Sequence, residues 1–419
     1  MDAVRLSLIA LLSMAPLLLV ACDKEERAAP ATPTAPPTST LTVESTPVVL
    51  PSPVPLEEGA LITEGGFYVS EVGTQRLWKI GDRPGSWSPD GKTLIFAGCC
   101  VGTGGIDLLH VESGLAERIF TGDVAGVAWS PDGNQVAFSR FANGPQGLYV
   151  MNANGSGLRQ LSDGGTWNPK WSPRGDRIAF QPPGQADVYL LDLSSGEITG
   201  IANSPGPDAW FAWSPAGESL AFADETGLYI YDLDAGSRRQ LTHGPSAGPI
   251  WSPDGSRIAL YYGPRLPFAH DQQAGNQVPH LIQVQGSAEP RPLPPARNLS
   301  WSPDGTQLAY LSEGCITREW DVYTIGAGGT APQRLTNTPD VLKEGPYWSP
   351  DGSALVFSLF DLSAGSKLVL VDTSSQELRT LAVSGPPGSA PGFHLDGDVW
   401  SADGRYVSFF ADGGHGVCD

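Results

Sequence analysis

Basic residues and cysteines are scarce in this chain of 419 residues. Lys and Arg total 25 against 45 Asp and Glu, which gives a formal net charge of −20. A surface this acidic lacks the cations that neutralise phosphates, so a nucleic-acid partner is excluded. The five cysteines and six histidines show no zinc-ligand spacing, and no glycine-rich phosphate loop is present. We therefore expect neither a metal nor a cofactor.

Long hydrophobic runs are also missing, except at the N-terminus. Residues Leu6 to Val20 are apolar apart from two serines and a proline. The run falls short of the roughly 20 residues that span a membrane, and it fits the apolar region of a signal peptide. Residues 28–55 are almost entirely Ala, Pro, Thr, Ser and Val, and such a segment has too little apolar surface to form a core. We expect it to be a disordered, extended tether.

The end of the apolar run carries a family resemblance. Leu19-Val20-Ala21-Cys22 resembles the lipobox of bacterial lipoproteins. The resemblance implies removal of residues 1–21 as a signal peptide and acylation (such as palmitate) of Cys22, with residues 22–58 as the lipidated tether. The protein is then expected to be extracytoplasmic in the cell envelope, anchored to the inner or the outer membrane by its acyl chains. The alternative is an ordinary signal peptide in which Cys22 occurs by chance.

One five-residue motif recurs along the rest of the chain, first as WSPDG at 87–91. It returns, complete or with one substitution, at spacings of 38 to 52 residues. Pro presets the first turn position, Asp bonds nearby backbone and Gly supplies a positive φ, so the motif predicts a hairpin turn. The spacing is typical of four-stranded propeller blades. The repeated tryptophans, interpreted as structural wedges rather than carbohydrate-binding platforms, are Trp87, Trp129, Trp171, Trp213, Trp251, Trp301, Trp348 and Trp400.

A strand with one apolar face follows each motif. The residues seven and nine positions after each Trp are apolar, as Leu94 and Phe96 are after Trp87. The chain ends two strands after its last motif, and it begins with two strands, within 66–80, before its first. We predict an all-β propeller of eight four-stranded blades, in which N- and C-terminal strands interlock to close the last blade. Seven blades are the alternative, because two of the longer spacings allow irregular blades.

The repeats resemble those of a known family. Together with MNANGSG at 151–157 and LTNTP at 335–339, the motifs are similar to the WD-like propeller repeats of the TolB family. The resemblance covers residues 59–419 and implies a propeller there. It implies no single function, because the same repeats serve in periplasmic scaffolds and in peptidase propeller domains. TolB itself is six-bladed with an added N-terminal domain, so its partners are not transferred to this chain.

The sequence offers little catalytic machinery. GPSAG at 244–248 matches the nucleophile-elbow pattern, but no helix follows it, so we do not assign a catalytic residue there. Asp396 and Asp398 near His394 are interpreted as solvated turn residues rather than metal ligands. The cysteines after Cys22 all follow predicted second strands, and an exported protein favours disulfides. The candidates are Cys99, Cys100, Cys315 and Cys418, with a bond from Cys418 to Cys99 or Cys100 latching the ring and free thiols as the alternative.

A ligand is expected on the face away from the WSPDG turns. Loops rich in Trp, Arg and acidic residues on a rigid scaffold suit recognition. The candidate ligand-binding residues there are Trp167, Lys170, Asp208, Trp210, Arg297, Glu344, His394 and Asp398. The function expected is a non-catalytic binding or scaffolding module for an envelope protein or glycan. The alternative is a surface hydrolase or lyase that uses acidic and His residues at the channel mouth, which requires carboxylates converging near His394 or Glu344.

Overall fold

The computed structural model describes most of the chain from residue 48 onwards. The described residues are 48–50, 55–56, 61–74, 76–81, 85–98, 104–141, 144–182, 187–202, 210–263, 278–286, 289–313, 320–338, 342–361, 365–384, 392–395 and 398–411. They all belong to one compact unit, Pro33–Asp419. Among them, no helix has the length and apolar character needed to cross a membrane. The signal segment predicted at 1–21 and Cys22 lie outside the described residues.

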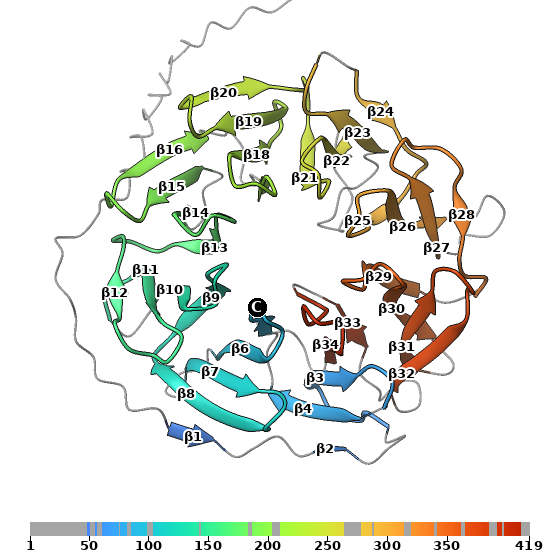
Figure 1. Cartoon of the computed structure of the whole chain (residues 1–419), viewed down its shortest axis with the longest axis horizontal. Coiled ribbons are helices and arrows are strands. Elements are labelled where there is room, and N and C mark those ends of the chain that lie inside the picture. Colours follow the sequence, from blue (N-terminus) through green and yellow to red (C-terminus); the bar gives the residue numbers. More distant parts are fainter. Residues whose placement is uncertain are drawn as a thin grey trace, which may run out of the picture. The chain divides into compact units, whose positions relative to one another are not determined.

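Eight antiparallel sheets follow one another around a ring, which confirms the predicted propeller (Figure 1). We number the blades from the first motif, and each sheet runs from the centre of the ring outwards. Blades 1 to 4 contain β5(Gly85–Trp87), β6(Thr93–Gly98), β7(Gly105–His110), β8(Leu115–Thr121); β9(Val124–Trp129), β10(Gln135–Arg140), β11(Gly147–Asn152), β12(Arg159–Gln160); β13(Trp167–Trp171), β14(Arg177–Gln181), β15(Val188–Asp192), β16(Ile198–Ala202); and β17(Trp210–Trp213), β18(Ser219–Ala223), β19(Leu228–Asp232), β20(Ser237–Gln240). Blades 5 to 7 contain β21(Ser246–Trp251), β22(Arg257–Tyr262), β23(Val278–Gln283), β24(Arg291–Pro292); β25(Arg297–Trp301), β26(Gln307–Glu313), β27(Trp320–Gly326), β28(Gln333–Arg334); and β29(Leu342–Trp348), β30(Ala354–Asp361), β31(Gly365–Asp372), β32(Leu378–Val383).

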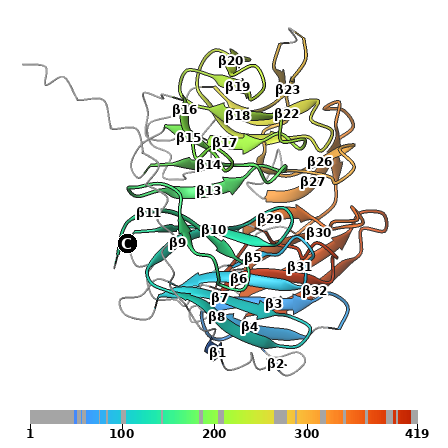
Figure 2. The same cartoon turned by 60° about the vertical axis from the view of Figure 1, so that its left-hand side comes forward.

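Blade 8 is made from both ends of the chain, as predicted. Its strands are β33(Phe393–His394), β34(Tyr406–Ala411), β3(Gly66–Glu71) and β4(Leu77–Gly81). β3 and β34 pair over six residues, from Gly66 opposite Ala411 to Glu71 opposite Tyr406. In the side view the strands of blade 7 lie next to β3 and β4 (Figure 2). The ring is therefore closed by hydrogen bonds between segments more than 300 residues apart in sequence.

An aromatic pair shows that the composite blade copies the internal ones. In blade 2 Phe138 of the second strand stacks on Tyr149 of the third, with ring centroids 5.6 Å apart. In blade 8 the same pair is Phe409 from the C-terminal strand and Tyr68 from the N-terminal strand, at 5.7 Å. Such cross-strand aromatic pairs stabilise a sheet beyond the area that they bury.

The hydrophobic core is divided among the eight junctions between neighbouring blades. One cluster, for example, joins Ile106 and Phe120 of blade 1 to Val136 and Phe138 of blade 2. Another joins Val356 of blade 7 to several buried residues of blade 8. Because successive side chains of a strand point to opposite faces, each blade contributes to two such clusters. The fold therefore depends on contacts between neighbours rather than on one central core.

The WSPDG motif forms the turn between the first and second strands, as predicted. In blade 1 the Ser88 hydroxyl donates to the Asp90 carboxylate at 2.6 Å and accepts from the Thr93 amide at 3.0 Å. Gly91 has a φ of 70°, a region that other residues adopt only with strain. The turn thus depends on all three polar or special residues at once.

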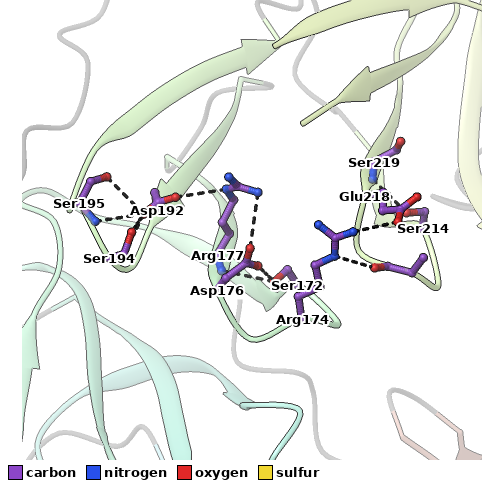
Figure 3. Close-up of polar contacts among 11 residues, drawn as sticks. Ser172, Arg174, Asp176, Arg177, Asp192, Ser194, Ser195, Ser214, Glu218 and Ser219 are labelled. Atoms are coloured by element: carbon purple, nitrogen blue, oxygen red, sulfur yellow. Dashed lines mark hydrogen bonds and ion pairs between the residues drawn. The ribbon is translucent and has the colours of Figure 1, made fainter. Parts of the chain in front are cut away.

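The two imperfect motifs of blades 3 and 4 compensate for their substitutions (Figure 3). Arg174 replaces the motif aspartate in blade 3, and the Ser172 hydroxyl donates to Asp176 instead, at 2.6 Å. Arg174 reaches blade 4, where its Nε donates to the carbonyl of Ala216 and its Nη2 to Glu218, at 3.1 and 2.8 Å. Ala216 is itself a substitution for the motif aspartate. One arginine therefore links the two turns that lack the motif aspartate.

The repeated tryptophans form a ladder of hydrogen bonds around the ring. In seven blades the indole Nε1 donates to a backbone carbonyl on the first strand of the preceding blade. The seven acceptors, at 3.0 to 3.2 Å, are the carbonyls of Ser86, Ala128, Lys170, Ala212, Ile250, Ser300 and Tyr347. At the ring closure Trp87 donates instead to the Ser408 hydroxyl, which in turn donates to the Asp398 carbonyl at 3.1 Å. The indoles thus occupy the blade junctions.

Two short strands fall within the range predicted as a tether. β1(Val48–Leu50) pairs with the outer edge of blade 1, and β2(Pro55–Leu56) pairs with the outer edge of blade 8 (Figure 1). The amide of Ile62 then donates to the Val383 carbonyl at the outer edge of blade 7. β1, β2 and Ile62 therefore contact the outer edges of three consecutive blades, including the composite one.

Candidate functional site

The first strand of each blade lies nearest the centre of the ring and carries most of the candidate residues (Figure 1). Each first strand begins at the face that we call the mouth face and ends at the WSPDG turns, which define the turn face. Side chains alternate along these strands, so neighbouring residues point to opposite sides of the blade.

Glu344 and His394 come together at the mouth face. Glu344 lies on β29 of blade 7, and His394 lies on the short strand β33 of blade 8. Glu344 Oε2 and His394 Nδ1 are 3.1 Å apart, with 39% and 49% of the two side chains exposed. A carboxylate at this distance orients an imidazole and stabilises its protonated form, which is the usual support for an acid–base histidine. An enzymatic site was expected to need several carboxylates near His394 or Glu344, and among the described residues Glu344 is the one carboxylate paired with His394.

Lys343, next to Glu344 in the sequence, is buried, whereas Glu344 is partly exposed. Its side chain is fully buried, and its Nζ lies 3.3 Å from Asp321 Oδ1 of blade 6 and donates to the Thr338 carbonyl at 2.9 Å. Asp321 also accepts from Thr336 at 2.7 Å and from Arg334. Burial acts to raise the pKa of Asp321, but the Thr336 hydrogen bond and the charges of Lys343 and Arg334 outweigh it and hold this pKa below its usual value. This buried cluster joins blades 6 and 7.

Three other candidates lie apart from the Glu344–His394 pair. Lys170 Nζ donates to the Phe211 carbonyl at 3.3 Å and lies 4.9 Å from the centre of the Phe211 ring. Burial lowers the pKa of Lys170. Trp210 is 40% exposed at the start of β17. Arg297 of blade 6 lies over the ring of Trp320, 4.6 Å from its centre. The candidates therefore divide between blades 3–4 and blades 6–8 instead of forming one site.

Asp398 lies closer to the turn face, beside the ring closure. Its Oδ2 accepts a hydrogen bond from the Ser86 hydroxyl of blade 1 at 2.6 Å. It lines a hollow of about 410 Å³ whose other walls are residues of blades 1, 6, 7 and 8. Four consecutive blades meet at one hollow only along the central channel, so this hollow is part of the channel.

Several sequence predictions lie outside the described residues. These are Asp208, Asp396 and all five cysteines, Cys22, Cys99, Cys100, Cys315 and Cys418. The backbone of Trp167 begins β13, but its side chain is not described. The disulfide latch therefore stays a prediction.

Ser246 is the serine of the GPSAG segment, which matches the nucleophile-elbow pattern in sequence. Ser246 is 3% exposed within β21, and its hydroxyl donates to the Gly244 carbonyl. Ser246 is therefore a buried strand residue with a hydrogen bond inside its own turn. Within the described ranges, no three His, Cys, Asp or Glu residues are grouped so as to hold a metal ion.

The turn face carries concave features that were not predicted from the sequence. A groove of about 560 Å³ lies between blades 1 and 2, and one of about 530 Å³ lies between blades 7 and 8. The first contains a second histidine–carboxylate pair, His110 Nε2 and Glu117 Oε1, at 3.4 Å. Both grooves are lined by residues of the turns of neighbouring blades, and no single residue of the motif predicts them.

Two sequence comparisons relate part of the chain to peptidases. Residues 179–250 match the family model described as the dipeptidyl peptidase IV (DPP IV) N-terminal region. The chain is also 28% identical over 124 residues to the uncharacterized peptidase YuxL of Bacillus subtilis (strain 168). That match covers 26% of this chain and 17% of YuxL, so the chain spans less than a fifth of this relative.

Solved structures share the fold across most of the chain. Dipeptidyl peptidase 4 of Porphyromonas gingivalis is similar with a TM-score of 0.58 and 12% identity, over 78% of this chain and 56% of that one. TolB from Acinetobacter baumannii is 16% identical over 83% of this chain and 64% of that one, with a TM-score of 0.39. At 12% identity the likeness to dipeptidyl peptidase 4 shows a shared fold and no more, and no conclusion is drawn from the TolB match at its TM-score. Membership of the TolB family and lipoprotein status stay predictions.

The predicted non-catalytic binding or scaffolding function is wrong in the light of these comparisons. The sequence relatives are a peptidase and the propeller-type region of a peptidase family. That prediction relied on the lack of a catalytic set in the sequence. That absence is a poor guide, because a propeller can serve an enzyme without carrying the nucleophile itself. The chain is thus a β-propeller that matches part of a peptidase and the N-terminal region of a peptidase family in sequence.

Proposed function

We propose that this chain is a propeller of the hydrolase class that acts on peptides, with Glu344 and His394 at the channel mouth as its acid–base pair. The proposal rests on one geometric observation, the 3.1 Å contact between these side chains across the junction of blades 7 and 8. The peptidase matches supply the substrate class.

The architecture around the pair suits this role. Glu344 lies on β29, and the residue before it on the same strand, Lys343, is anchored in the buried cluster with Asp321. On the blade 8 side, the Tyr347 hydroxyl donates to the Leu395 carbonyl at 3.1 Å and so links β29 to the residue after His394. Both partners are thus held by contacts on rigid strands while their side chains stay accessible to a ligand. Such support preserves the geometry that acid–base catalysis requires.

The chemistry assigned to the pair is proton transfer. His394 accepts a proton from the attacking water as its oxygen bonds to the peptide carbonyl carbon, and Glu344 stabilises the imidazolium that results. His394 then returns the proton to the amine as the carbon–nitrogen bond breaks. The products are a carboxylic acid and an amine, so atoms and charge balance.

The test is cleavage of a defined peptide mixture by the full chain, followed by mass spectrometry. We expect time-dependent cleavage, lost to a large extent in His394→Asn and reduced about 100-fold in Glu344→Gln, since general acid–base catalysis contributes about 10²–10⁴-fold. The matched controls are His110→Asn and Glu117→Gln, which disrupt the other described histidine–carboxylate pair, on the turn face. They are expected to leave cleavage unchanged.

Two outcomes would contradict the proposal. One is the absence of cleavage above a buffer blank by the native chain. The other is an equal loss in both sets of variants, which would indicate an effect on folding instead of chemistry.

The predicted lipid anchor on Cys22 and the extracytoplasmic location are compatible with a hydrolase of exported peptides. They remain proposals that rest on the lipobox resemblance. A partner in the cell envelope also remains a proposal.

A further inference from the structure

The channel contains an aromatic hollow near the turn face that the proposed peptide site does not use. Its lining includes Trp87, Trp301, Trp348 and Trp400 together with Tyr347, so each of the four blades that border it contributes part of an aromatic side chain. Most of each indole is packed in its blade junction, and 5%, 8% and 9% of Trp87, Trp301 and Trp348 stay exposed. Pro89 and Pro303 add apolar rings at the turn end. At about 410 Å³ the hollow has the size of a site for a small organic molecule.

Among the described residues that line the hollow, Asp398 supplies the only charged side chain. It stands two positions before the motif tryptophan of blade 8. The equivalent positions of the other blades are uncharged, being Gly85, Val127, Pro169, Phe211, Pro249, Leu299 and Pro346. The negative charge is therefore a departure from the repeat, confined to the blade where the ring closes.

The carboxylate of Asp398 is held in place by the closure itself. Its Oδ2 accepts from the Ser86 hydroxyl at 2.6 Å, and its backbone carbonyl accepts from Ser408, which also receives the Trp87 indole NH. The side chain and the backbone of Asp398 are thus fixed from blade 1 and from β34. One hydrogen bond occupies part of the acceptor capacity of a carboxylate, which has about four lone-pair sites.

An organic cation complements this lining. Aromatic rings attract a cation through their quadrupole, most strongly when the cation is poorly hydrated, and a carboxylate adds direct charge attraction. A neutral molecule gains at most a hydrogen bond from Asp398, without the charge attraction, and an anion is repelled by it. A strongly hydrated metal ion would leave the aromatic walls without a role, because such ions prefer oxygen ligands.

We propose that this hollow binds a small organic ammonium compound, with its cationic group at Asp398 and its alkyl body against the tryptophans. The site is independent of the proposed hydrolase function, since neither Glu344 nor His394 lines it.

The test uses choline as the probe and the full chain as the protein. Isothermal calorimetry and quenching of tryptophan fluorescence are each followed as choline is added. The uncharged isostere of choline, in which carbon replaces nitrogen, serves as the matched ligand. We expect saturable binding of choline, at least about tenfold weaker binding of the isostere, and about tenfold weaker binding of choline by Asp398→Asn, which loses a charge-assisted contact.

Two further variants separate binding from folding. Asp351→Asn removes the carboxylate of a WSPDG turn that does not line the hollow, and it is expected to bind choline as the native chain does. Ser86→Ala removes the hydrogen bond that holds the Asp398 carboxylate in place. Because the charge remains but its position is less fixed, this variant is expected to weaken choline binding by a smaller factor than Asp398→Asn. Circular dichroism and thermal melts verify that each variant is folded.

The proposal is overturned if choline and its isostere bind equally, if folded Asp398→Asn retains native affinity, or if the native chain shows no saturable binding of choline. Loss of peptide cleavage has no bearing on any of these readouts, so failure here is distinguishable from failure of the hydrolase proposal.

Discussion

At the scale of single residues, the repeated turn owes its stability to a serine hydroxyl that donates to an aspartate. In blade 5 the Ser252 hydroxyl donates to Asp254 at 2.5 Å, and this bond, with further bonds from Ser256, lowers the pKa of Asp254 to about 2. Because the folded-state pKa lies below the ordinary value near 3.9, ionised Asp254 stabilises the fold above about pH 4. That contribution is lost as the pH falls through about 2. Asp254 is largely exposed, so solvent screening limits its size.

Blade 4 allows this interpretation to be tested by gain of stability. Ala216 occupies the aspartate position there, next to Arg174 of blade 3. We expect Ala216→Asp to raise the free energy of unfolding by about 1 kcal/mol at neutral pH, through a hydrogen bond from Ser214. The gain should disappear between about pH 4 and pH 2, where the new carboxylate becomes protonated. Chemical denaturation at a series of pH values measures both effects.

The matched control for that variant is Ala216→Asn, which offers a similar acceptor without charge. Its gain should be smaller and independent of pH over the same range. A lower stability of Ala216→Asp at neutral pH would show that the Arg174 link between the turns matters more than the missing serine–aspartate bond.

At the scale of the elements, alternation along one strand separates structural from accessible charges. On β29 Lys343 is buried against Asp321 of blade 6, whereas Glu344 meets His394 of blade 8. Breaking a buried ion pair by removing one partner costs about 3–5 kcal/mol, because the other charge is left without its counter-ion.

We expect Lys343→Met to lower the free energy of unfolding by about 3 kcal/mol, at the lower end of that range, because Arg334 still neutralises Asp321. Urea denaturation measures the loss. In the double variant Lys343→Met with Asp321→Asn, part of the stability should return, since no uncompensated buried charge remains. If the double variant loses as much as the sum of the single changes, the pair contributes no coupling and the interpretation fails.

At the scale of the whole molecule, closure depends on strands from both chain ends and on β1, β2 and Ile62 at the outer edges. β3 and β34 supply the main closing contact, and β1, β2 and Ile62 add backbone hydrogen bonds to blades 1, 8 and 7. β3, β34 and Ile62 lie within the predicted propeller domain at 59–419, whereas β1 and β2 precede this domain.

We therefore expect a chain that begins at residue 59 to fold as a propeller with a lowered melting temperature. The outer edges of blades 1 and 8 would lose the pairing of β1 and β2, while the closing strands stay in place. Differential scanning calorimetry and circular dichroism measure the change. A truncated chain without a cooperative transition would contradict the predicted domain boundary.

The repeat architecture was predictable because its causes are local. The turn chemistry of 87–91 and the apolar pairs such as Leu94 and Phe96 recur in each blade, so the blade count followed from counting motifs. Even the closure was predictable, since two unmatched strands at each end have only each other as partners. The tryptophan ladder shows why the indole recurs: its NH satisfies a carbonyl of the neighbouring blade at a fixed distance in space rather than in sequence.

The sites were decided by the tertiary structure. Glu344, His394 and Asp398 were each candidates from the sequence, but they were predicted to lie together on the loops of one face. Only the ring brings Glu344 within 3.1 Å of His394 across a blade junction, and only the closure places Asp398 beside Ser86, 312 residues earlier in the chain. The sequence determines strands and turns because those depend on near neighbours, whereas a channel is formed by residues that meet only after all eight blades have closed.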